Sequence, residues 1–142
     1  MAKGIVTPEL IEQLKAIVGE KYVYTDKDKL EPYSHDEVTD PHYMKEPQVV
    51  VLPANTEEVA KVVKLCYDND TVVPRAAGTG LAAGAVATFG GVIISIERMN
   101  KILEIDKQNM VCVTEPGVTT AVLQEEVQKE GLFYGGDPCS GD

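Results

Sequence analysis

The chain of 142 residues has no tryptophan, only two histidines, His35 and His42, and three widely separated cysteines, Cys66, Cys112 and Cys139. No cysteine pair has the Cys-x-x-Cys spacing, which argues against a zinc or iron–sulfur site. Two histidines without carboxylates do not make the usual three-ligand catalytic zinc site. We therefore expect no metal site. We also expect reduced thiols, with Cys66 and Cys112 as small core residues.

Basic residues are scarce as well, with 13 Lys and Arg against 23 Asp and Glu and a formal net charge of -10. This balance argues against nucleic acid or an anionic membrane surface as a partner, because both attract Lys and Arg. No apolar run approaches the ~18 residues of a membrane span. The first residues lack the apolar core of a signal peptide. These features predict a cytoplasmic protein, and the length is that of one domain.

Acidic residues are absent from Thr71 to Ile96, where Arg75 is the only charged side chain. This run contains Gly78, Gly80 and Gly84, and glycine lets a backbone approach a ligand and direct successive N–H groups at it. The pattern predicts a site for an anion, most simply the pyrophosphate of a dinucleotide. Tight packing sites and ordinary turns have similar compositions. A solvated loop arginine is the alternative interpretation of Arg75.

The glycine spacing differs from that of a Rossmann dinucleotide site. The fingerprint is Gly-x-Gly-x-x-Gly, whereas here three residues separate Gly80 from Gly84. A Rossmann turn also opens a helix, with an acidic residue about 20 positions on. Glu97 is suitably placed, but the segment from Ala85 to Gly91 is short and rich in glycine. The sequence therefore disfavours a Rossmann-type NAD enzyme and favours a different pyrophosphate loop.

Periodicity and breakers predict mixed secondary structure. Thr7 caps a first helix that Gly19 closes, and an extended arm follows over 20–47, with one helical turn near 28–33. A strand–helix–strand unit comes next, in which Thr56 caps the helix. The remaining expectations are strands over 48–52, 71–74, 92–96, 102–106 and 110–114, a helix that Thr119 or Thr120 caps and that ends at Gly131, and a short apolar run over 132–134. The fold class is α+β, with a small parallel βαβ sheet flanked by helices and the start of a second, largely antiparallel sheet.

Four motifs in order resemble one family. They are Gln48–Pro53 with Thr56–Val59; Val73–Arg75 with Gly78–Leu81 and Gly84-Ala85; Ile105-Asp106 with Val113 and Glu115–Val118; and Gly131-Leu132 with Tyr134 and Asp137-Pro138-x-Ser140. This series resembles the N-terminal half of the FAD-binding domain of the vanillyl-alcohol oxidase and p-cresol methylhydroxylase (PCMH) type. Within that group it is similar to the branch of D-lactate dehydrogenase and the glycolate oxidase D-subunit. The resemblance covers about residues 5–142.

The resemblance implies FAD as the cofactor and assigns binding roles to residues of this sequence. Pro74 and Arg75 set the start of the pyrophosphate loop, Pro116 and Gly117 shape the adenine side, and Asp137, Pro138 and Ser140 approach the isoalloxazine. A turn residue before proline is the alternative for Asp137. Ala77 stands where glycine is common, and alanine is tolerated there only with ordinary dihedral angles. The residues around the pyrophosphate and the ADP half are Ala76, Ala77, Gly78, Thr79 (through its hydroxyl), Gly80, Leu81, Gly84 and Ala85.

The activity implied is FAD-dependent oxidation of a small D-2-hydroxy acid, D-lactate or glycolate. Electrons would pass to an electron-transfer flavoprotein, a quinone, a cytochrome or an iron–sulfur subunit. By resemblance, the catalytic residues lie outside this chain. Residues 1–47 are then an N-terminal helix and arm, and residues 48–142 are the N-terminal portion of the FAD-binding domain.

The last residues, Gly135 to Asp142, have the composition of a glycine-rich loop with no following element. The chain is therefore interpreted as an N-terminal fragment, inactive alone and able to self-associate; a disordered tail is the alternative. A stand-alone nucleotide- or phosphate-binding module without catalysis is the competing hypothesis for the whole chain.

Overall fold

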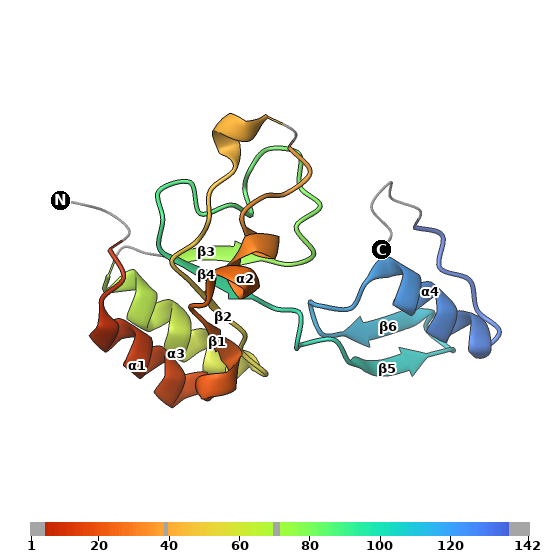
Figure 1. The fold of residues 1–142 in the computed structure, drawn as a ribbon. Helices are drawn as coiled ribbons and strands as arrows, with labels where there is room; N and C mark the ends of the chain where they lie inside the picture. The colour runs from red at the N-terminus through yellow and green to blue at the C-terminus, as the bar shows by residue number, and fades with distance from the viewer. Residues whose placement is uncertain (1–4, 39, 70–71, 137–142) are drawn as a thin grey trace. The chain divides into compact units, whose positions relative to one another are not determined.

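The structure, a computed structural model, describes residues 5–38, 40–69 and 72–136. The chain divides into two compact units, Met1–Arg98 and Met99–Asp142 (Figure 1). Each unit has its own sheet: four strands in the first and two in the second. The predicted combination of a parallel sheet with an antiparallel one is therefore confirmed.

The sheet of the first unit has the strand order β1-β2-β4-β3. The parallel strands are β2 (Val49–Val51), β4 (Val92–Ser95) and β3 (Val72–Arg75), with β4 in the middle. Both outer strands align with β4, because Val50 and Val73 each pair with Ile93. Consecutive parallel strands need a crossover connection. Helix α3 (Thr56–Tyr67) supplies it between β2 and β3, as predicted, whereas β3 reaches β4 through a long segment without a helix.

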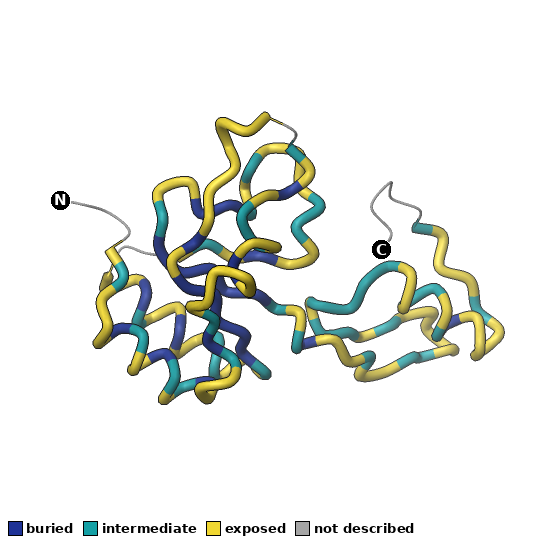
Figure 2. The backbone as a smooth tube through the Cα atoms, in the orientation of Figure 1, coloured by how far each residue is buried: buried dark blue, intermediate teal, exposed yellow. Residues whose placement is uncertain are grey.

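The two faces of this sheet are covered by different parts of the chain. Alternate residues of a strand point to opposite faces, and the core divides accordingly. The buried residues are concentrated in the strands of this sheet and in the helices beside it (Figure 2). On one face, Val49, Val51, Val92 and Ile94 pack with α1 (Pro8–Val18) and α3. On the other, Val50 and Ile93 pack with Leu30, Leu52 and Ala87. Ala87 belongs to the β3–β4 connection, so that connection and the arm share one face.

The caps of the helices largely follow the sequence. Thr7 Oγ1 accepts the N–H of Leu10 at the start of α1, and Gly19 follows its end. The predicted Thr56 cap of α3 is wrong by one residue. Asn55 is the N-cap, with extended backbone angles, and its Oδ1 accepts the N–H of Glu58 at 2.9 Å. Asparagine caps a helix at least as well as threonine, so the cap forms one residue earlier.

The arm between α1 and β2 contains more structure than its sequence predicts. The expected helical turn is present as α2 (Lys27–Leu30) and a 3₁₀ helix over Glu31–Tyr33. Two further 3₁₀ helices span Glu20–Tyr22 and Pro41–Tyr43. The unpredicted element is β1 (Val23–Tyr24), which pairs antiparallel with β2. A strand of two residues is too short to show an alternating hydrophobic pattern, so β1 can be recognised only from its pairing with β2.

The second unit is a hairpin followed by a helix. Strand β5 (Ile102–Asp106) pairs antiparallel with β6 (Val111–Thr114), as predicted, with an irregularity between Ile102 and Glu104. Helix α4 (Thr120–Lys129) begins after the N-cap Thr119, which decides between the two threonines. It ends two residues before Gly131. The apolar run 132–134 is not a strand.

Two further observations bear on the predictions from composition. Within the described ranges, no helix has the length and apolar character that crossing a membrane requires. Cys66 is buried and Cys112 is half-buried, both as free thiols, whereas Cys139 lies outside the described residues.

Candidate functional site

The glycine-rich segment is the connection between the parallel strands β3 and β4, and it begins at the C-terminal end of β3. Ligands in α/β sheets bind at this edge, outside the carboxyl ends of the strands. The whole connection from 76 to 91 consists of turns, bends and irregular segments, with no helix. A Rossmann site places its pyrophosphate at the start of a helix, so the observed geometry excludes that arrangement here.

The backbone N–H groups of the loop are its most distinctive feature. From Ala76 to Ala85, none donates a hydrogen bond to an acceptor in the described part of the chain. None of these ten residues is buried, so water can satisfy their N–H groups when no ligand is bound. In a segment without acidic side chains, the same N–H groups are available to an anion. The hydroxyl of Thr79 adds a further donor of the right kind.

The three glycines of the loop differ in whether their position could accept a side chain. Gly78 has a φ of +77°, and a Cβ there would come 2.5 Å from Arg75 Cζ, so the protein's own packing demands glycine. At Gly80 a Cβ would make ordinary contact with Asp36 Oδ2 at 3.7 Å, and at Gly84 it would meet nothing within 4 Å. Neither position has a left-handed φ. The open space at Gly84 is what close approach of a ligand would use.

Two alanines of the loop, Ala77 and Ala83, differ in their backbone dihedral angles. Ala77 is absent from the residues with positive φ, so alanine is tolerated at this position. Ala83 does adopt a positive φ of 56°, which is uncommon for a residue with a Cβ. Its carbonyl accepts the N–H of Val86 at 3.2 Å, in the turn that leads into the buried Val86 and Ala87.

Arg75, the last residue of β3, is buried, with 8% of its surface exposed. Its guanidinium donates to three backbone carbonyls, those of His35 (2.7 Å), Pro32 (3.2 Å) and Ala85 (3.3 Å). The interpretation of Arg75 as a solvated loop arginine is therefore wrong. Burial lowers the pKa of Arg75, while Tyr33, Asp36 and Glu97 act in the opposite direction. Arginine nevertheless keeps its charge in proteins.

Sequence reasoning missed the arm as part of this site. Glu37 donates its N–H to the carbonyl of Gly80 at 3.1 Å. Asp36 is buried beneath the loop; its Oδ1 accepts the N–H of Val38, and its Oδ2 has no partner among the described residues. The sequence of the arm has no hydrophobic periodicity, so these contacts could not be predicted from it. The one available signal was the lone Arg75, whose charge needs partners from elsewhere in the chain.

Two further predicted site residues precede or belong to the loop, and the others come later in the chain. Pro74 is the third residue of β3, and Leu81 is an exposed loop residue. Pro116 and Gly117 belong to the second unit, in the turn after β6, where Gly117 donates its N–H to Met99 at 2.7 Å. Asp137, Pro138 and Ser140 lie outside the described residues. Within the residues that are described, no three His, Cys, Asp or Glu side chains gather as a metal site.

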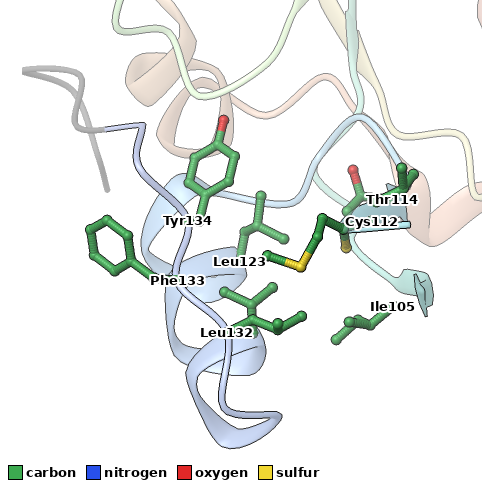
Figure 3. A pocket seen from close by; sticks show the side chains of 10 residues that line it. Ile105, Cys112, Thr114, Leu123, Leu132, Phe133 and Tyr134 are labelled. Atoms are coloured by element: carbon green, nitrogen blue, oxygen red, sulfur yellow. The ribbon is translucent and has the colours of Figure 1, made fainter. Parts of the chain in front are cut away.

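The second unit contains an apolar hollow of about 290 Å³ (Figure 3). Its walls come from the hairpin, from Leu123 of α4, and from the segment Leu132–Tyr134. No charged side chain lines it, and most of its lining is apolar, with hydroxyl groups only from Thr114 and Tyr134.

Comparison with known proteins identifies the family to which the region around the loop belongs. The family described as FAD binding domain matches residues 47–142, which include the loop. The chain belongs to this FAD binding domain family. FAD is accordingly its cofactor, as the sequence predicted. The matched residues include Ala76–Ala85, whose N–H groups have no acceptor in the described part of the chain.

Individual relatives agree with the predicted branch. The chain is 45% identical over 135 residues to a D-lactate dehydrogenase of Anaerostipes hadrus, covering 94% of this chain and 28% of that protein. It is 36% identical over 138 residues to the glycolate oxidase subunit GlcD of Bacillus subtilis, covering 96% of this chain and 29% of that protein. The chain thus spans less than a third of the length of these FAD-linked oxidoreductases.

Solved structures agree on the fold. The chain resembles p-cresol methylhydroxylase with substrate bound, with a TM-score of 0.78 and 26% identity over 89% of this chain and 26% of that one. This likeness confirms the PCMH-type architecture expected from the four motifs.

Proposed function

We propose that the chain supplies the pyrophosphate-binding part of an FAD site in an enzyme that oxidises a D-2-hydroxy acid, with D-lactate or glycolate as the substrate. The observation that carries the proposal is the run of ten loop N–H groups, Ala76 to Ala85, that have no acceptor among the described residues. The relatives named D-lactate dehydrogenase and glycolate oxidase subunit support the substrate class.

Each predicted site residue has a proposed role. The backbone from Ala76 to Leu81 binds the pyrophosphate, Thr79 adds its hydroxyl, and Gly84 and Ala85 leave room for the ADP half. Pro116 and Gly117 shape the adenine side. Asp137, Pro138 and Ser140, which lie outside the described residues, are proposed to approach the isoalloxazine.

The chemistry divides between cofactor and protein. Bound FAD supplies the two-electron acceptor, and the residues of this chain bind and orient it and keep its phosphates desolvated. No catalytic residue is assigned to this chain. The electrons are proposed to leave through an electron-transfer flavoprotein, a quinone or an iron–sulfur subunit.

The proposal includes the domain boundaries of the chain. Residues 48–142 form the N-terminal portion of the FAD-binding domain, supported by the family match from residue 47, and residues 1–47 precede it as helix and arm. Because exposed apolar side chains such as Leu103 (59%) and Phe133 (79%) are plentiful in the second unit, we propose that the chain self-associates when isolated. Sedimentation velocity tests this, and a monomer at all concentrations would contradict it.

The test of function is an FAD titration of this chain beside a version that continues past Asp142, followed by flavin fluorescence. We expect tight binding by the longer protein and weak binding by the chain alone, because a cofactor site needs walls on several sides. ADP and D-lactate are titrated in parallel. Binding of ADP without FAD by the longer protein would favour the stand-alone nucleotide module instead. Binding of neither would overturn the pyrophosphate site.

A further inference from the structure

The guanidinium of Arg75 contacts backbone carbonyls on two separate segments. Pro32 and His35 belong to the arm, and Ala85 stands near the end of the glycine-rich loop. Arg75 itself is the residue before the loop begins. One side chain therefore closes the loop across its ends and fastens both ends to the arm. The planar fork of arginine suits several acceptors at once, which a lysine ammonium does not match.

The arm also holds the middle of the loop. The N–H of Glu37 donates to the carbonyl of Gly80, and Gly78 lies against the guanidinium, where a Cβ would come within 2.5 Å of Cζ. The carbonyls of Gly80 and Ala85 are thus both occupied by donors. A loop binds an anion only if its N–H groups, and not its carbonyl oxygens, face the anion. These contacts fix two of those oxygens on donors of the protein.

Acidic and aromatic side chains surround the guanidinium of Arg75, but none of them forms an ion pair with it among the described residues. The guanidinium lies 5.6 Å from the centre of the Tyr33 ring, and Asp36 and Glu97 act on it electrostatically. Both Arg75 and Asp36 are buried. Three N–H groups of Arg75 already donate to backbone carbonyls and the side chain is buried, so the guanidinium is poorly placed to pair directly with a phosphate.

We propose that Arg75 is a positioning residue of the FAD site, which acts through the shape of the loop and not by pairing with the pyrophosphate, and that the arm from Pro32 to Glu37 is a structural part of that site. This proposal rests on the FAD function proposed above. It extends the site to residues that precede the matched region 47–142.

The test compares Arg75→Lys with Arg75→Gln in the full-length protein that carries this chain. Lysine keeps the charge and loses the fork, whereas glutamine loses both. The matched control is Arg98→Lys, because Arg98 also donates to a carbonyl, that of Leu52 at 2.6 Å, and stacks on Tyr22, away from the loop. The readouts are the Kd for FAD by flavin fluorescence, its dependence on salt, and the melting temperature without FAD.

We expect both Arg75 variants to weaken FAD binding by about tenfold or more, with an unchanged salt dependence, while Arg98→Lys binds FAD as the parent does. If Arg75→Lys binds like the parent and Arg75→Gln alone is weak, with a smaller salt dependence, Arg75 acts by charge and the proposal is overturned. A parent protein that binds no FAD would instead refute the proposed function.

A second measurement covers the case in which Arg75→Lys does not fold. Hydrogen exchange at the Glu37 amide is followed in the parent protein with and without FAD. We expect FAD to slow this exchange, because a fixed loop holds the Gly80 carbonyl on its donor. Unchanged exchange at Glu37 in the presence of saturating FAD would show that the arm and the cofactor are not linked.

Discussion

The hydroxyl of Tyr33 donates to Glu97 Oε1 at 2.5 Å, which joins the arm to the residues that follow β4 across 64 positions of sequence. Burial and this hydrogen bond raise the pKa of Tyr33. The bond lies on the same face of the sheet as the glycine-rich loop, where Tyr33 packs against the cluster of Val50 and Ile93. The arm is thus fastened by a side chain of its own as well as by Arg75.

Replacing Tyr33 by phenylalanine should lower the free energy of unfolding by about 1 kcal/mol, because the ring remains and the hydrogen bond is lost. Because the pKa of Tyr33 is raised, the difference in stability between the two proteins depends on pH. The folded state holds the phenol proton more firmly, so the advantage of tyrosine is complete below pH 10 and declines above it.

Urea unfolding at pH 7 and at increasing pH above 10 measures both effects. Tyr43→Phe is the matched control, because Tyr43 is 46% exposed and its hydroxyl has no partner within the described residues. Equal losses in the two variants would contradict the structural role of the Tyr33 hydroxyl.

Substitutions at two glycines of the loop should affect different properties, stability at Gly78 and FAD binding at Gly84. Gly78→Ala should destabilise the chain without FAD by about 1–2 kcal/mol, because its φ of +77° and the neighbouring guanidinium both resist a Cβ. Gly84→Ala should leave that stability within about 0.5 kcal/mol, because its Cβ would meet no atom within 4 Å.

In the longer protein, Gly84→Ala should nevertheless weaken FAD binding, since the added methyl group occupies space proposed for the ADP half. Thermal unfolding without FAD and flavin fluorescence titration measure the two properties. A Gly84→Ala protein that is less stable but binds FAD normally would reverse the assignment.

The N-cap of α3, predicted at Thr56 and found at Asn55, provides a third prediction. Asn55→Ala should cost about 1 kcal/mol of stability, because it removes the acceptor of the Glu58 N–H. Thr56→Ala should cost much less, because Thr56 is exposed at the first position inside α3. Chemical unfolding followed by circular dichroism compares them, and a larger loss for Thr56→Ala would restore the original assignment.

Cys66 should be the less reactive of the two described thiols. Burial raises its pKa to about 11, so at pH 8 it is almost entirely protonated, and the thiolate is the reactive form. Alkylation at pH 8, resolved by mass spectrometry, should label Cys112 well before Cys66. Equal rates in the folded protein, with both fast in denaturant, would contradict the buried placement.

The same pKa predicts a pH dependence. Because the pKa in the folded state lies above the ordinary value of 9.0 for a thiol, the contribution of the thiol is complete below about pH 9 and is lost as pH rises through 11. The difference in unfolding midpoint between the parent and Cys66→Ala should therefore shrink between pH 9 and pH 11.

Much of the fold follows from local sequence. Thr7 before Pro8, the apolar residues of α1 and α3, and the runs that became β2, β4 and β5 are patterns that neighbours along the chain create. The position of the glycine-rich loop after β3 was equally evident, because composition and charge change sharply at Arg75. Such features depend on residues a few positions apart, so they can be recognised without the tertiary structure.

What the local pattern does not contain is the partner of each buried polar group. Arg75 finds Pro32 and His35 about forty residues earlier, Val23 and Tyr24 become a strand only beside β2, and Asp36 is buried beneath Gly80. Each case joins segments far apart in the chain, and the free energy of burying a charge depends on which acceptors the fold brings to it. The position of the glycine-rich loop is therefore a property of the sequence, and the arrangement that holds its shape is a property of the folded chain.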